Sequence, residues 1–302
     1  MNLSEIARGV FFTELGAMQH LIDGCIEGKD PQLVHDLRVT NRRTRAALIV
    51  FEGLIPEEIH QKFQIDLRWV HQITGEVRDL DVGLAFFPFY QKQVAKSWRQ
   101  YLEPLRSLMN NKRKTAQREF ARALGSDRMT GIFDTWSDLL QNGTLENNPL
   151  SHEPAREYGC QQIVKRYTHL RKRGLKLTKN TAAEKYHEFR INVKELRYLI
   201  EFFHPVIEID EFEKNKIGLK LVQDAFGEFQ DTEIQMINLS LLTQELYQDE
   251  ASLDTLLSLG QLLGVFEKKL SRSKKRCLKQ VRWLTTDSTA RAFQSCFQYP
   301  VE

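Results

Sequence analysis

Two stretches of the sequence share one spacing of basic residues, and that spacing is suited to binding anions. Each stretch begins with a histidine and continues with basic residues three, seven and ten positions later. The two sets are His35, Arg38, Arg42 and Arg45, and His187, Arg190, Lys194 and Arg197. The planar fork of arginine can contact two phosphate oxygens at once, lysine adds a point charge, and histidine titrates near neutral pH. These residue types therefore favour recognition of phosphate groups.

Both stretches are predicted to be helices, because neither contains glycine or proline. A helix turns by about 100° per residue, so each set of four falls within an arc of roughly 80°. Apolar residues occupy the opposite faces, namely Leu33, Leu37, Leu48 and Phe51 in the first helix, and Phe189, Leu196, Ile200 and Phe203 in the second. We call the two cationic faces the first stripe and the second stripe.

A charged face opposite an apolar face is also typical of an ordinary solvent-exposed helix, and this interpretation competes with a binding site. Two features favour binding. Both stripes are entirely cationic, and we expect them to lack the acidic partners four residues away that a merely soluble face tends to carry. The same stripe also occurs twice, and His187 follows His35 by 152 residues.

This offset of 152 residues extends beyond the two helices. Gly75, Glu76 and Asp79 fall in register with Gly227, Glu228 and Asp231. Shared register over so long an interval predicts an internal duplication of about half the chain. Asp79 and Asp231 are expected to orient a nearby arginine or to cap a helix.

The periodicity predicts an all-α fold of two tandem antiparallel four-helix bundles related by this duplication, because no segment alternates like a strand. Residues 1–127 are predicted to form the first half, 128–154 a short helix and linker, and 155–302 the second half. The other helices are predicted over Ser4 to about Glu27, Glu57 to about Phe86, about Tyr90 to Leu124, near Met129–Leu140, about Asp210 to Leu246, and about Ala251 to Leu284. Pro88 is expected to mark a turn or kink, and Pro104 to kink or cut its helix.

Length and composition are those of a globular protein. The 302 residues are 41% hydrophobic and 27% charged, with a formal net charge of +3. No apolar run approaches the roughly 20 residues of a membrane span, and the N-terminus has no apolar core of a signal peptide. The four cysteines are widely spaced, which favours free thiols in a reducing cytoplasm.

Further basic residues cluster on two of the other predicted helices and on a further helical stretch between Gly159 and Ala183, and they could assist the stripes. They are Lys112, Lys114 and Arg118; Lys165, His169, Lys172, Arg173 and Lys176; and Arg272, Lys275, Lys279 and Arg282. Grouped cations repel one another, and an anionic ligand would relieve that repulsion. The linear, repeated arrangement favours an extended polyanion over one small phosphate ester.

The two H-x-x-R-[VI]-x-x-[RK]-x-x-R stretches resemble the paired signature of the conserved-histidine α-helical domain (CHAD) family. The segments beginning at Gly75 and Gly227 resemble the motif that follows in each half, although Gln230 stands where the first half has Arg78. The resemblance implies non-catalytic binding of inorganic polyphosphate between the halves, through the eight stripe residues, and possible targeting to polyphosphate granules in the cytoplasm. It implies no cofactor.

Three alternatives remain open. The same cations would neutralise the backbone of RNA or DNA, although no exposed aromatics interleave with them. A phosphate-transferring enzyme is a further possibility. Asp79 and Asp81 would point about 200° apart on a helix and could not share a metal, however, and no base is positioned beside His35 or His187. The third alternative is a scaffold protein that binds an acidic partner protein. The sequence leaves the oligomeric state undetermined.

Overall fold

The computed structural model describes residues 1–207 and 213–297, with the side chains of 213–215 left aside. Its first half is helical throughout. The elements are α1 (Leu3–Glu27), α2 (Pro31–Val50), η1 (Glu52–Leu54), α3 (Glu57–Ile73), α4 (Gly75–Gln93), η2 (Lys96–Leu102) and α5 (Glu103–Leu124), where η denotes a short 3-10 helix. A connecting region follows, with α6 (Asp127–Gln141), η3 (Thr144–Glu146) and η4 (Pro149–His152).

The second half is built from fewer and longer helices. They are α7 (Ala155–Gly174), α8 (Ala183–Phe203), α9 (Glu213–Gln248), α10 (Leu253–Thr285) and α11 (Asp287–Phe297). The start predicted near Asp210 lies outside the described residues. Within the described ranges the fold is all-α, as predicted, and its only bridge pairs Asn2 with Pro154.

Helix starts in the two halves agree with the offset of 152 residues. Helix α1 begins at Leu3 and α7 at Ala155, while α2 begins at Pro31 and α8 at Ala183. Each pair is separated by the same 152 residues that separate His35 from His187. This agreement is what an internal duplication predicts.

The turn between α1 and α2 follows from its sequence. Gly28 ends α1 with φ +67°, a left-handed conformation that glycine adopts without steric penalty. Asp30 caps α2 by accepting a hydrogen bond of 2.8 Å from the backbone N–H of Gln32, and Pro31 occupies the first turn. These residues fix where α2 starts, and therefore which face presents the first stripe.

The prediction of one continuous helix from Glu57 to Phe86 is wrong, because two helices, α3 and α4, meet at Thr74. The Thr74 hydroxyl donates back to the carbonyls of Val70 (3.0 Å) and His71 (2.9 Å) and also accepts a hydrogen bond from Arg38 of α2. The matching position in the second half is the buried Phe226, and α9 continues through it as a helix of 36 residues.

The turn predicted at Pro88 is wrong, whereas the helix predicted from about Tyr90 to Leu124 is cut just before Pro104, as expected. Pro88 lies inside α4, which continues to Gln93. No new helix therefore begins near Tyr90, where the sequence predicted one. Pro104 lies in the first turn of α5, where the missing N–H would have no helical partner in any case. The 3-10 helix η2 separates α4 from α5.

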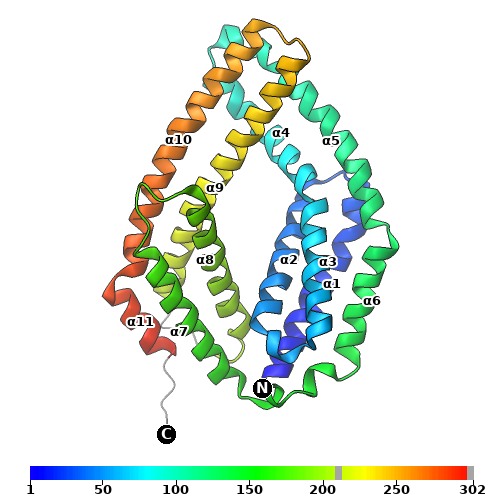
Figure 1. Cartoon of the computed structure of the whole chain (residues 1–302), viewed down its shortest axis with the longest axis vertical. Helices are drawn as coiled ribbons and strands as arrows, with labels where there is room; N and C mark the ends of the chain where they lie inside the picture. The colour runs from blue at the N-terminus through cyan, green and yellow to red at the C-terminus, as the bar shows by residue number, and fades with distance from the viewer. Residues whose placement is uncertain (208–212, 298–302) are drawn as a thin grey trace.

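The two halves contact each other at both ends of the long axis of the molecule, and α2 and α8 face each other across its middle (Figure 1). At one end Phe51 packs against Phe203, with ring centroids 5.8 Å apart. At the other end Tyr90 meets Phe266 edge to face, also at 5.8 Å. Helices α7, α10 and α11 form the outer layer on one side, and α1, α5 and α6 lie on the other (Figure 1).

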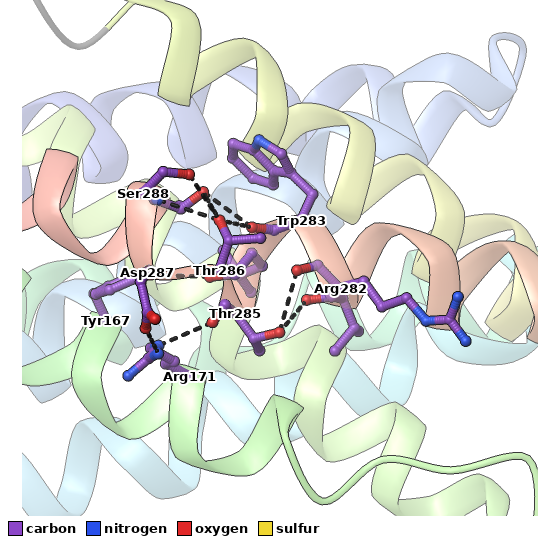
Figure 2. Close-up of polar contacts among 11 residues, drawn as sticks. Tyr167, Arg171, Arg282, Trp283, Thr285, Thr286, Asp287 and Ser288 are labelled. Carbon is purple, nitrogen blue, oxygen red and sulfur yellow. Dashed lines mark hydrogen bonds and ion pairs between the residues drawn. The ribbon is translucent and has the colours of Figure 1, made fainter.

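The C-terminal helix α11 is docked against α7 and the end of α10 by a polar network (Figure 2). Arg171 donates to the Thr285 carbonyl at 3.0 Å and pairs with Asp287 at 2.6 Å. The Thr286 hydroxyl caps α11 by accepting from the N–H of Thr289 at 3.2 Å.

In the described part of the chain, no helix combines the length and apolarity needed to span a bilayer. No disulfide joins any of the four cysteines, all of which lie in the described part of the chain.

Candidate functional site

The predicted division of α2 and α8 into an apolar and a cationic face is confirmed. Seven of the eight predicted apolar residues are buried, and Leu33 is partly buried against the core. The first stripe lies on α2 and the second on α8. Because each helix packs its apolar face into its own half, both stripes border the region where the halves meet.

The structure brings the two stripes together. The Nε of Arg42 donates a hydrogen bond of 2.9 Å to the Tyr198 hydroxyl, so a stripe residue of α2 is tied to α8. Arg42 also lies close enough to Arg190 and Lys194 to oppose their protonation, and Lys194 acts in the same way on His35. Side chains 150 residues apart in sequence therefore share one electrostatic environment.

Lys194 is the most unusual member of this cluster, because it is only 7% exposed. Burial, and after it the neighbouring Arg190 and Arg42, lower its pKa to about 7, while Asp231 opposes the shift. No carboxylate in the described residues lies within salt-bridge distance of the lysine. A buried cation that lacks an ion-pair partner is costly, and one surrounded by other cations is more so.

Arg38 is held by the interruption between α3 and α4. Its Nη1 donates to the His71 carbonyl at 3.2 Å and to the Thr74 hydroxyl at 3.0 Å. Burial lowers the pKa of Arg38, and nearby Asp79 opposes that shift. The side chain of Asp79 itself accepts a hydrogen bond from Asn238 of α9, so its role in orienting an arginine stays a prediction.

The two histidines have different surroundings. Burial lowers the pKa of His35, and the positive charge of Arg78 lowers it further. His187 instead lies 2.6 Å from Gln230, between Nδ1 and Oε1, so the imidazole Nδ1–H donates to the amide oxygen. Gln230 occupies the position that Arg78 has in the first half. The second half therefore has a neutral residue, Gln230, in place of the cation Arg78, and this residue orients His187.

Acidic residues lie beside the last arginine of each stripe, at the end farther from the histidine. Arg197 pairs with Glu201 at 3.0 Å, which corrects the expectation that the stripes lack acids four residues away. Glu201 also pairs with Arg43 of α2, and Arg43 with Glu14 at 2.6 Å. Arg45 lies near Glu195, which pairs with Arg166 at 2.7 Å. At the histidine end, Asp79 and Asp231 lie near Arg38 and Lys194, but in the described residues neither forms a salt bridge with a stripe residue.

Tyr198 belongs to the site and is absent from the predicted residues. It is buried, accepts from Arg42, and has the guanidinium groups of Arg43 and Arg197 each 5.3 Å from its ring centroid. Cations at this distance are attracted to the face of an aromatic ring. The equivalent position in the first half is Ala46, so the repeat gives no signal for this residue.

The other predicted basic residues are not gathered around the stripes. Lys112 pairs with Glu245 at 2.9 Å, and Arg173 lies 3.6 Å from Glu188. The remaining ten are exposed on the outer helices α5, α7 and α10, or just after α7: Lys114, Arg118, Lys165, His169, Lys172, Lys176, Arg272, Lys275, Lys279 and Arg282. In the described part of the chain, none of them contacts a stripe residue.

The stripes do not form a metal centre. Among the described residues, no three His, Cys, Asp or Glu side chains gather closely enough to hold an ion. The site instead presents guanidinium, ammonium and imidazole groups, which bind anions by charge-assisted hydrogen bonds.

Comparisons with known proteins agree with this geometry. The CHAD domain family model matches residues 10–240. The crystal structure of the CHAD domain from the plant Ricinus communis is similar, with a TM-score of 0.77, 26% identity and coverage of 93% of this chain and 92% of that one. PptA from Streptomyces chartreusis shares the fold, with a TM-score of 0.70, 13% identity and coverage of 93% and 100%. No curated protein matches the sequence.

The family model spans well over half of the chain, and both stripes lie within it. The chain therefore belongs to the CHAD domain family.

Proposed function

We propose that this protein binds inorganic polyphosphate, without catalysis, between the two stripes. The observation that carries the proposal is Lys194, a buried lysine with cationic neighbours and no ion-pair partner in the described residues. Such a residue destabilises the empty protein, and a bound anion would supply the missing negative charge. A ligand that carries that charge would offset the cost of burying Lys194.

The arrangement of the stripes favours a chain of phosphates over a single phosphate. Six cationic or titratable side chains line the histidine end of the two stripes: His35, Arg38, Arg42, His187, Arg190 and Lys194. They are spread along several turns of α2 and α8, so one phosphate could contact only a few of them. Arg45 and Arg197, which have acids nearby, would form the less positive boundary of the site.

Nucleic acid is the weaker candidate for this site. The aromatic residue among the stripes, Tyr198, is buried and already faces two guanidinium groups, so it offers no free surface on which a base could stack. Phosphate contacts alone would bind RNA or DNA without selectivity. Excess polyphosphate should therefore displace RNA at a much lower concentration than RNA displaces polyphosphate.

Charge reversal of the first stripe tests the proposal. The double variant Arg38→Glu, Arg42→Glu should weaken polyphosphate binding by about 100-fold or more, because two attractive contacts become repulsive. The matched control is Lys114→Glu, Arg118→Glu, which makes the same change of net charge on the exposed face of α5. Isothermal titration calorimetry measures affinity, and circular dichroism verifies that both variants remain helical. Equal affinity of the two variants would overturn the proposal.

Two further measurements separate binding from the alternatives. Affinity should fall steeply with salt, because binding releases the counterions of the polymer. No phosphate should be released from polyphosphate in the presence of Mg²⁺ or Mn²⁺. Sustained release would instead support the enzyme alternative. In a cell that accumulates polyphosphate granules, fluorescently labelled protein should colocalise with them, and the stripe variant should not.

A further inference from the structure

The outer face of α10 carries a straight row of five basic residues that the site above does not use. Successive members are separated by four, three, four and three residues, which keeps them on one side of a helix. They are Lys268, Arg272, Lys275, Lys279 and Arg282, and we call this row the α10 ridge. At 1.5 Å per residue the row is about 21 Å long. The buried residues Phe266, Cys277 and Val281 lie on the opposite side of the helix.

The α10 ridge has no internal compensation of its charge. The sequence contains no Asp or Glu from Lys268 to Thr286. Cations on other faces of α10 are engaged, since Arg276 pairs with Glu228 at 2.6 Å and Lys274 donates to the Thr181 carbonyl at 2.8 Å. In the described residues, no ridge member has a carboxylate within salt-bridge distance, and Figure 2 shows the Arg282 side chain extending away from the polar contacts around it.

We infer that the α10 ridge is a second binding surface for a linear phosphate polymer, separate from the stripes; this inference rests on the proposed function. Surface charges of a soluble protein ordinarily mix both signs, whereas the ridge keeps five like charges in one row. Their mutual repulsion is relieved when a polyanion lies along the helix and releases its counterions.

The chemistry of the ridge favours polyphosphate over nucleic acid. Trp283, the aromatic residue of this helix segment, packs closely over Gly218 of α9, so its ring is not free to stack on a base. The ridge is also the convex surface of a single helix. A flexible chain with a negative charge at every unit can follow that surface, and successive cations rise by about 5 Å along it.

The position of the ridge makes its contribution depend on chain length. Helix α10 packs against α9 and α7 on its inner side, while the stripes lie on α2 and α8 in the middle of the molecule (Figure 1). Because α9 lies between α8 and α10, we expect a short polymer held between the stripes not to reach the outer face of α10 (Figure 1). A long polymer that fills the stripes has free length that can bind the ridge, and the second contact raises its overall affinity by avidity.

The test compares four proteins: wild type, a ridge variant, a control variant and the stripe variant Arg38→Glu, Arg42→Glu. The ridge variant is Arg272→Gln, Lys275→Gln, Lys279→Gln, Arg282→Gln. The control is Lys114→Gln, Arg118→Gln, Lys165→Gln, Lys172→Gln, which removes four exposed cations from other helices. Each protein is titrated with a polyphosphate of about ten phosphates and with one of several hundred, and thermal unfolding verifies that the variants fold.

The ridge variant should bind the long polymer about tenfold more weakly than the control variant does, and the two should bind the short polymer equally. Equal binding of the long polymer by these two proteins would overturn the inference. Failure of the proposed function gives a different result, in which the stripe variant binds the short polymer as tightly as wild type. The two failures are therefore distinguishable in one set of titrations.

Discussion

The Nε of Arg42 donates a hydrogen bond of 2.9 Å to the hydroxyl of Tyr198, and this contact joins the two stripes. Arg42 belongs to α2 and Tyr198 to α8, and the two residues are 156 positions apart. Tyr198 is buried, so its hydroxyl has little access to water. The bond therefore fixes the direction in which one arginine of the first stripe faces the second.

Replacement of Tyr198 by Phe tests this role. The change removes one hydroxyl and keeps the ring that Arg43 and Arg197 face. A hydrogen bond to a charged group contributes about 1.5–3 kcal/mol to stability, so the melting temperature should fall by a few degrees. Polyphosphate affinity should fall by about tenfold, because Arg42 is no longer held facing the second stripe. In a variant that already carries Arg42→Ala, the Phe replacement should have no further effect on affinity. A full additional loss there would show that Tyr198 does not act through Arg42.

Lys194 predicts that binding depends on pH. Its pKa in the empty protein is lowered to about 7, chiefly by burial, so the amine loses its proton as the pH rises through 7. A bound anion favours the charged amine, which means that binding takes up a proton and that affinity falls from pH 6 to pH 8.5. Calorimetry in buffers of different ionisation enthalpy measures this uptake.

The control for that prediction is Lys194→Arg, because arginine stays protonated over the whole range. It should bind with a flatter pH dependence than the parent. His35 cannot account for the same titration above neutrality, since burial lowers its pKa from the ordinary value. An unchanged pH profile in Lys194→Arg would assign the proton to another group.

The same lysine should reduce the stability of the empty protein. Its folded pKa of about 7 lies below its value in the unfolded chain, so the unfolded state binds more protons between roughly pH 7 and 10. The contribution of Lys194 to the free energy of unfolding is therefore unfavourable at neutral pH and becomes less so as the pH rises. Lys194→Met should raise stability by about 1–3 kcal/mol at pH 7 while weakening polyphosphate binding, as measured by urea unfolding and titration. A destabilised variant would contradict this account.

Glu201 should have opposite effects on stability and on binding. It pairs with Arg197 of the second stripe and with Arg43 of α2, so it both joins the halves and compensates part of the stripe. Glu201→Gln should lower the free energy of unfolding by about 1 kcal/mol and should strengthen polyphosphate binding a few-fold, because Arg197 becomes available. A variant that is less stable and also binds more weakly would indicate that Arg197 lies outside the site.

Local signals decided much of the fold. Gly28, Asp30 and Pro31 set the turn before α2, and the period of the apolar residues identified the buried faces of α2 and α8 correctly. The break at Thr74 was not recognised, because a threonine that bonds back to the backbone does not by itself interrupt a helix, as Thr44 inside α2 shows. The hydroxyl of Thr74 also accepts a hydrogen bond from Arg38 of α2, a contact between helices that the sequence does not reveal. The turn predicted at Pro88 was wrong as well, since α4 continues through this residue to Gln93.

The sequence by itself determined that eight basic residues occupy two helical faces in a repeated spacing. It could not determine which of them share one environment, because that depends on how two helices from different halves pack. Only the tertiary structure decided three features: Lys194 is buried among cations, the Tyr198 hydroxyl accepts a hydrogen bond from Arg42, and Glu201 neutralises part of the charge of Arg197. Spacing along the sequence specifies the direction in which a side chain leaves the helix axis. Burial and charge compensation depend instead on residues that are distant in the chain.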